Sequence, residues 1–102
     1  MKHKTFNEEQ ILRASNMLKA IAHPTRIKIL DILKNGEKLN VSQIQGQIKT
    51  EQSTTSHHLS LLKDKGVLCS TRNGKNIHYY IKHLVLGQII DCMQKCTCKE
   101  EN

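Results

Sequence analysis

The hydrophobic period of the sequence changes at Gly66. Before it, apolar residues recur at the three- and four-residue spacing of amphipathic helices. After it, residues 67–72 and 75–81 read as two short strands that flank Asn73-Gly74, the strongest short signal for a β-hairpin. Apolar residues return to helical spacing from residue 82. We therefore expect a mainly α domain that carries one β-hairpin near its C-terminal end.

Two helices are predicted in the first third of the chain. Asn7 and Gln10 have the spacing of a capping box, which places the start of a helix over 7–22. Pro24 disfavours helix at the preceding residue and suits a first helical position, so a second helix should start there and end at Asn35-Gly36. This second helix is apolar on most of its circumference, and we expect it to be the buried central helix.

Residues 40–66 are predicted to form two helices joined by a tight turn. Asn40 and Gln43 form a second capping box, which begins a short helix. The turn falls at 49–51, and a longer helix runs from Gln52 to Lys65 and closes at Gly66. With the hairpin at 67–81 as a wing, this order is the winged helix-turn-helix plan. The whole chain, 1–102, is then one domain, which ends in a fifth helix at 82–96 and a frayed tail at 97–102.

The charge of the chain points to a polyanionic partner. Sixteen Lys and Arg against nine Asp and Glu give a net charge of +7.

No apolar run approaches the length of a membrane span, and the first six residues have no apolar signal-peptide core. We therefore expect a cytoplasmic protein with no membrane partner. Aromatic residues make up only 3%, which argues against single-strand binding by base stacking.

The fourth helix carries the side chains that double-stranded DNA requires. Its first turns are polar, uncharged and able to hydrogen bond, as base edges in the major groove demand. The predicted hairpin tip is short and basic, which suits a phosphate or the minor groove. The predicted DNA-binding residues are Gln52, Ser53, Thr54, Ser56 and His57 on the helix, and Arg72, Asn73 and Lys75 on the wing.

Three segments resemble the ArsR/SmtB family of repressors. They are residues 18–30 (LKAIAHPTRIKIL), 52–59 (QSTTSHHL) and 61–68 (LLKDKGVL). The resemblance covers about residues 12–86 and implies a homodimer held by the first and last helices. It further implies a repressor that binds an imperfect palindromic operator and leaves it when an effector binds. Residues Leu84, Ile89, Ile90 and Met93 are the expected dimer face of the last helix.

The family's metal-binding patterns are only partly present. The Cys-x-Cys pair of its metal-sensing members falls at residues 39–43, where this chain has no cysteine. The resemblance to members with C-terminal cysteines instead makes Cys92, Cys96 and Cys98 candidate ligands of a thiophilic metal or metalloid, with His83 as a further candidate for zinc.

Other interpretations of the cysteines stay open. Cys92 and Cys96 are one helical turn apart and can share a face, but they also suit a dimer seam and a solvated tail without an effector. Cys69 is a redox candidate with Cys92 as its partner. The cofactor is therefore unknown, and the choice includes none.

No enzyme signature is found. The chain lacks a Gly-rich phosphate loop and an H-E-x-x-H motif, and Ser56 and His57 are helical neighbours whose side chains diverge. The sequence predicts a DNA-binding transcriptional regulator that is not an enzyme. The alternative is an effector-independent DNA-binding, architectural or protein-interaction module.

Overall fold

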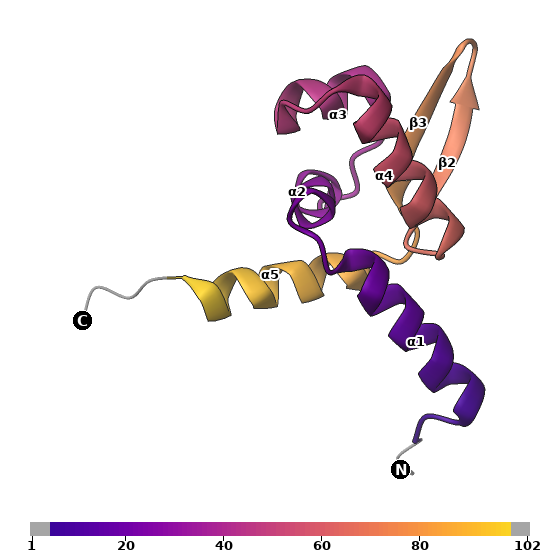
Figure 1. Cartoon of the computed structure of the whole chain (residues 1–102), viewed down its shortest axis with the longest axis vertical. Coiled ribbons are helices and arrows are strands. Elements are labelled where there is room, and N and C mark those ends of the chain that lie inside the picture. The colour runs from indigo at the N-terminus through magenta and orange to yellow at the C-terminus, as the bar shows by residue number, and fades with distance from the viewer. Residues whose placement is uncertain (1–4, 99–102) are drawn as a thin grey trace.

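The computed structural model describes residues 5–98, which form five helices and a small antiparallel sheet (Figure 1). In chain order the elements are α1 (Glu8–Ile21), α2 (Pro24–Leu33), β1 (Leu39–Asn40), α3 (Val41–Ile48), α4 (Gln52–Asp64), β2 (Leu68–Asn73), β3 (Asn76–Ile81) and α5 (Val85–Thr97). The predicted winged helix-turn-helix is confirmed. Within the described residues, no helix has the length and apolar character needed to cross a bilayer.

The helix starts follow from local capping. The side chains of Asn7 and Asn40 each accept a hydrogen bond from the backbone N–H three residues on. In return, the side-chain oxygens of Gln10 and Gln43 accept from the backbone N–H of Asn7 and Asn40. The ring of His23 accepts from the Thr25 N–H and so caps α2, whose first residue is Pro24.

The core is built around α2. This helix packs against α1, α3, α4, α5 and β3. Ile29, Leu30 and Leu33 of α2 are completely buried. Around them lie the other buried apolar side chains of the core: Ala20, Ile21, Ile44, Ile48, Leu59, Leu62, Val67, Leu68, Ile81, Leu86 and Ile90. The prediction that the second helix is central is confirmed, although Ile27 on its outer face remains partly exposed.

The wing differs from the prediction in two respects. A third strand, β1, pairs with β3 through Leu39 and Tyr79, so the sheet order is β1-β3-β2 rather than a lone hairpin. The hairpin turn lies one residue later than expected, because Asn73 pairs with Asn76 and leaves Gly74-Lys75 at the centre. Gly74 adopts φ +67°, which matches a turn with glycine at its first central position.

The last helix also begins and ends later than the predicted 82–96. The Lys82 N–H donates to the Val67 carbonyl, so the sheet pairing continues past Ile81 and the helix starts only at Val85. At the other end, Thr97 is still helical and Cys98 follows it as the cap. Of the predicted frayed tail, these two residues are ordered here, and 99–102 lie outside the described residues.

Two helices project from the body. Figure 1 shows the N-terminal half of α1 and the C-terminal half of α5 extending away from the other elements in different directions. The radius of gyration is 15.1 Å, against about 13 Å for a compact domain of this size. Within residues 5–98, parts of both helices therefore have no covering partner from the same chain.

Candidate nucleic-acid interface

Helix α4 has one buried face and one polar exposed face. Thr55, His58, Leu59 and Leu62 are buried against the rest of the domain. On the other face, Gln52, Ser53, Thr54 and His57 are exposed and Ser56 is half-buried. All five predicted α4 residues therefore lie outside the core, with hydrogen-bonding groups that a base edge or phosphate can meet.

A polar groove joins α4 to the wing. It has a volume of about 330 Å³ and is bordered by the start of α3, the start of α4 and the hairpin. Gln52 and Ser56 from α4 and Lys75 from the wing line it together. Residues that are far apart in the sequence thus meet on one surface.

The groove also has polar lining residues that were not predicted as DNA contacts, among them Ser42 and Asn76. Ser42 comes from the first turn of α3, and Asn76 opens β3 beside the turn. Ser42 lies two positions after the cap Asn40, so its place at a helix start was visible in the sequence. Its closeness to the wing was not, because that depends on the tertiary packing of β3 beside α3.

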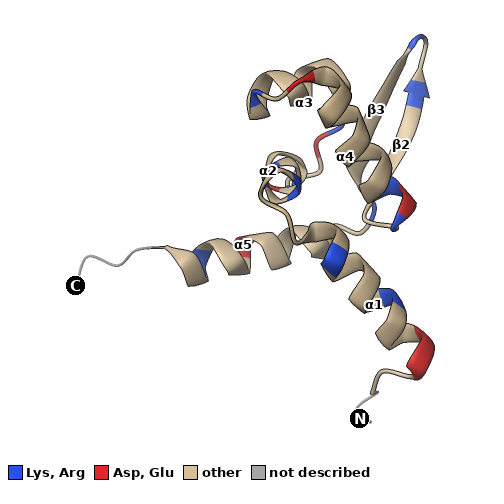
Figure 2. Ribbon diagram, viewed as in Figure 1, with Lys and Arg blue, Asp and Glu red and all other residues tan. Residues whose placement is uncertain are grey.

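The tip of the wing is basic and exposed. Arg72, Asn73 and Lys75 are all exposed, and Figure 2 shows Lys and Arg without acidic residues in this region. Residues 65–90 contain no Asp or Glu at all. Basic side chains at the end of a projecting hairpin can follow a neighbouring phosphate backbone.

Arg26 of α2 is hydrogen bonded to the buried face of α4. The Arg26 Nε donates to His58 Nδ1 at 3.1 Å, and its Nη1 donates to the Ala20 carbonyl at 3.1 Å. Burial lowers the pKa of His58, and the nearby His23, Arg26 and His57 lower it further. His58 therefore serves packing, as expected from its position beside the exposed His57.

The cysteines lie away from the groove. Cys92, Cys96 and Cys98 are exposed on the last turns of α5 and at its end, whereas Cys69 is half-buried in β2 opposite Tyr80. Cys69 and Cys92 are not joined in a disulfide. Within residues 5–98 of one chain, no three His, Cys, Asp or Glu side chains are grouped so that they could hold a metal ion.

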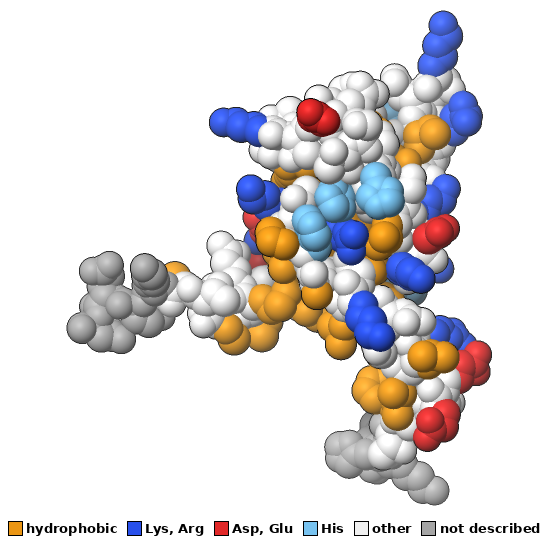
Figure 3. All heavy atoms as spheres, in the orientation of Figure 1, with side chains coloured by type: hydrophobic (Ala, Val, Ile, Leu, Met, Phe, Trp, Pro, Cys, Tyr) orange, Lys and Arg blue, Asp and Glu red, His pale blue; other side chains and the backbone are white. Residues whose placement is uncertain are grey.

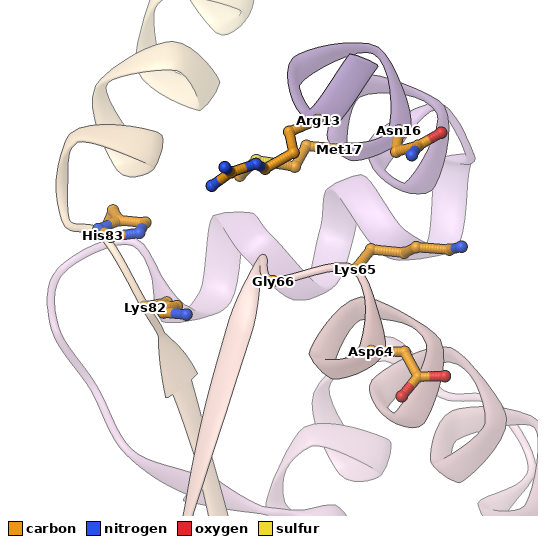
Figure 4. A pocket seen from close by; sticks show the side chains of 8 residues that line it. All are labelled: Arg13, Asn16, Met17, Asp64, Lys65, Gly66, Lys82 and His83. Carbon is orange, nitrogen blue, oxygen red and sulfur yellow. The ribbon is translucent and has the colours of Figure 1, made fainter. Parts of the chain in front are cut away.

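His83 lies in a basic pocket instead. This pocket, of about 430 Å³, lies between α1, the end of α4 and the turn before α5. Arg13, Lys65 and Lys82 line it with His83, and Figure 4 shows the Arg13 side chain projecting from α1 towards the side where Lys82 and His83 lie. Three cationic neighbours disfavour a bound cation, so the structure gives His83 no support as a metal ligand.

Exposed apolar side chains run along the projecting helices. They are Ile11, Leu12 and Leu18 on α1, and Leu84, Val85, Ile89 and Met93 at and along α5. Figure 3 shows hydrophobic side chains along the lower sides of both helices. Ile90 was expected on this face, but it is 4% exposed and belongs to the core of its own chain. That expectation was wrong.

Known proteins resemble this chain in sequence and in fold. The family model described as "Bacterial regulatory protein, arsR family" matches residues 23–69. The transcriptional repressor SdpR of Bacillus subtilis (strain 168) is 36% identical over 88 residues, which cover 86% of this chain and 97% of that protein. The transcriptional repressor PagR of Bacillus anthracis is 42% identical over 76 residues, covering 74% of this chain and 76% of PagR.

Solved structures agree with the sequence comparison. The crystal structure of PagR matches with a TM-score of 0.78 at 36% identity, over 85% of this chain and 99% of that one. The solution structure of the homodimeric winged helix-turn-helix domain Mb0332 from Mycobacterium bovis matches with a TM-score of 0.77 at 25% identity. That match covers 94% of this chain and 89% of the other.

Proposed function

The chain belongs to the arsR family of bacterial regulatory proteins, and from this premise we propose that it represses transcription by binding an imperfect palindromic operator as a homodimer. Members of this family are DNA-binding transcriptional regulators and not enzymes. In this proposal α4 enters the major groove and the wing contacts the neighbouring backbone.

One observation carries the proposal for the contacts. Gln52 and Ser56 of α4 and Lys75 of the wing line a single polar groove. A duplex bound along this surface would contact hydrogen-bonding side chains on α4 and cationic side chains at the wing tip. Arg72 and Asn73 are also exposed at that tip. The predicted residues on α4 would read bases, and those on the wing would hold phosphates.

The proposed dimer buries the exposed apolar faces of α1 and α5. These faces continue over two projecting helices that the described part of one chain does not cover. Interfaces of permanent dimers resemble a domain core cut in half, and this surface has that character. Mb0332, a structural neighbour, is described as homodimeric. A two-fold dimer presents two copies of α4, which suits inverted half-sites about 34 Å apart.

We further propose a thiol-directed effector at the end of α5. Cys92 and Cys96 lie on successive turns of the helix that carries the proposed dimer face, and Cys98 follows at its end. Because one chain offers no group of three metal ligands among the described residues, the chemistry we favour is thiol oxidation or a soft ion bridging Cys92 and Cys96. Either reaction would change how α5 pairs with its partner.

The DNA-binding proposal is tested by selecting duplexes from a random pool with the purified protein. We expect an enriched inverted repeat, and a native mass of two chains bound to one duplex. A triple variant, Gln52→Ala, Ser56→Ala and Lys75→Ala, should lose the enrichment. An unstructured consensus, or one chain per duplex, would contradict the proposal.

The effector proposal is tested on the selected duplex. Affinity is measured with As(III), Zn²⁺, Cu⁺, a persulfide and peroxide, for the wild type and for a variant with Cys92, Cys96 and Cys98 replaced by Ser. We expect a 5–150-fold loss with at least one reagent, equivalent to about 1–3 kcal/mol of coupling, and no loss in the variant. If no reagent lowers the affinity of the wild type, or if the variant loses affinity as the wild type does, the three cysteines are not the effector site. The alternative, an effector-independent DNA-binding module, is then favoured.

A further inference from the structure

Two histidines and an arginine meet where α1, α2 and α4 come together. His23 lies between α1 and α2, Arg26 in the first turn of α2, and His58 in the middle of α4. The ring centroids of His23 and His58 are 4.7 Å apart, and His57 follows at 6.1 Å from His58. Figure 3 shows the histidine side chains grouped beside a Lys or Arg side chain on this face.

Arg26 connects three elements through one side chain. Its Nε donates to His58 Nδ1, and its Nη1 donates to the Ala20 carbonyl near the end of α1. A guanidinium has donors only, so Nδ1 of His58 must be an acceptor. His58 is therefore neutral in this arrangement, with its ring proton on Nε2.

His23 uses its ring in the same way. Its Nδ1 accepts from the Thr25 N–H and satisfies a backbone donor at the start of α2. The junction thus contains two imidazole rings that both act as acceptors. A protonated imidazole has no acceptor, so either bond is lost when its ring takes up a proton.

We propose that Arg26 and His58 are positioning residues of the DNA-reading helix, and that protonation of His58 releases α4 from α2 and so weakens specific DNA binding in acid. This inference rests on the proposed role of α4. The proposed pH-sensitive contact lies on the buried face of α4, away from the groove that would contact DNA.

The surroundings of His58 make protonation disruptive. His58 is 6% exposed. A protonated ring there would face the Arg26 cation and could no longer accept its hydrogen bond. The charged or titratable groups that act on it are His23, Arg26 and His57, and all three oppose a positive charge. From α1, α3 and β2, which also pack on α4, no charged group among residues 5–98 acts on the ring.

The position of His57 connects the junction to DNA. It precedes His58 on α4 and is exposed beside Ser56, with its ring centroid 6.1 Å from that of His58. A rotation or loosening of α4 that follows the loss of the Arg26 bond therefore moves the predicted base-reading side chains. Specificity should fall more than general affinity, since the wing and its cations are not attached through this contact.

The test measures the ratio of affinities for a selected duplex and for its scrambled sequence. The selected duplex comes from a random pool enriched at pH 7.5. This ratio removes the general gain in affinity that exposed histidines give when they become cationic at low pH. We expect the wild-type ratio to fall at least tenfold between pH 7.5 and 5.5.

The informative variant is His58→Asn. Its side-chain oxygen takes the place of Nδ1 as an acceptor for Arg26 but does not titrate, so the ratio should change less than threefold over the same range. His78→Asn, in β3, is the matched control and should keep the wild-type pH dependence. Arg26→Gln should already lower the ratio at pH 7.5.

The outcomes separate this inference from the proposed function. A wild type without preference for any duplex at pH 7.5 contradicts the proposed function. A wild type with a constant ratio, or a His58→Asn variant with the wild-type pH dependence, overturns the role of His58. If His58→Asn does not fold, amide hydrogen exchange of residues 52–60 in the wild type tests whether α4 opens more readily in acid. Faster opening at pH 5.5 than at 7.5 supports the release of α4, and equal opening overturns it.

Discussion

The Nζ of Lys34, just after α2, lies 2.8 Å from a carboxylate oxygen of Asp91 in α5. The same ammonium lies 2.9 Å from Asp31 and donates to Gln94 at 3.3 Å. The hydrogen bonds with Asp91 and then Asp31 favour the charged ammonium and raise the pKa of Lys34. This contact joins the central helix of the DNA-binding body to the helix that carries the proposed dimer face.

A glycine brings the same two helices close together. A Cβ placed on Gly87 of α5 would stand 2.8 Å from the Lys34 carbonyl oxygen and 3.3 Å from its Cβ. Backbone cannot give way as a flexible side chain can. Gly87 is therefore required by packing, and α5 approaches α2 more closely than any larger residue would allow.

We predict that Gly87→Ala destabilises the domain by about 1–3 kcal/mol, because relieving the clash must shift α5 or the end of α2. The free energy of unfolding in urea measures this. Gly46→Ala in α3 is the matched control: beyond its chain neighbours and the backbone of its own helix, no atom lies within 4 Å of the added Cβ. This substitution should stabilise the protein by up to about 1 kcal/mol through helix propensity. Equal effects of the two substitutions would contradict the packing role of Gly87.

The dimer is tested by Ile89→Glu. Ile89 is 40% exposed in one chain, so the substitution spares the core but places a charge in the proposed interface. We expect the native mass to fall from twice 11.7 kDa towards one chain, with loss of binding to the inverted repeat. Gln88→Glu makes the same change in charge at an exposed neighbour and should stay dimeric. A dimeric Ile89→Glu protein with full DNA affinity would contradict the interface.

Local signals in the sequence were sufficient for most element boundaries. The capping boxes at Asn7 and Asn40 and the proline at position 24 act over three or four residues, so the starts of α1, α2 and α3 could be predicted. The two-residue strand β1 could not, because it exists only by pairing with β3. The late start of α5 likewise depends on the bond between Lys82 and Val67.

The sequence alone did not predict which apolar residues of α5 are buried or which distant residues are in contact. Ile89 and Ile90 look alike in the sequence, and only the position of α2 decides that Ile90 is buried and Ile89 is exposed. The same holds for Arg26 and His58, which are 32 positions apart and form one hydrogen bond. The exposed polar face of α4 and the basic tip of the wing were easier to predict, because polarity along a helix and charge on a hairpin are local properties.

Base reading is tested by Ser56→Ala and His57→Ala. If each side chain makes a good base contact, each substitution should lower discrimination between the selected and scrambled duplexes by about 1–3 kcal/mol. Ser60→Ala is the control, because Ser60 is exposed one turn further along α4 and does not line the polar groove. Unchanged discrimination in both test variants would exclude α4 as the reading helix.

The wing should contribute differently. Arg72→Ala removes a proposed phosphate contact, so it should weaken binding to all duplexes alike and reduce the salt dependence by about one counterion. Titrations at several salt concentrations measure this slope. Arg13→Ala removes the same charge from α1, where it pairs with Glu9 at 2.9 Å, and should leave the slope unchanged. Equal slopes for wild type and Arg72→Ala would place the wing away from the backbone.

The lowered pKa of His58 predicts a pH-dependent stability that needs no DNA to observe. The unfolded chain binds a proton at His58 near the ordinary histidine pKa of about 6.5, whereas the folded chain binds it only at lower pH. Between these two values the unfolded state holds more protons, so the free energy of unfolding falls as pH is lowered through this window. Below the folded pKa this contribution is fully lost.

Urea unfolding of the wild type and of His58→Asn between pH 7.5 and 5.0 measures this contribution. The variant also loses ring packing, so the slope of stability against pH is compared and not its absolute value. We expect a shallower slope in His58→Asn than in the wild type, and a wild-type slope in His78→Asn. Parallel slopes for wild type and His58→Asn would show that the folded and unfolded chains protonate this residue alike, and the buried acceptor role of His58 in the Arg26 bond would then be wrong.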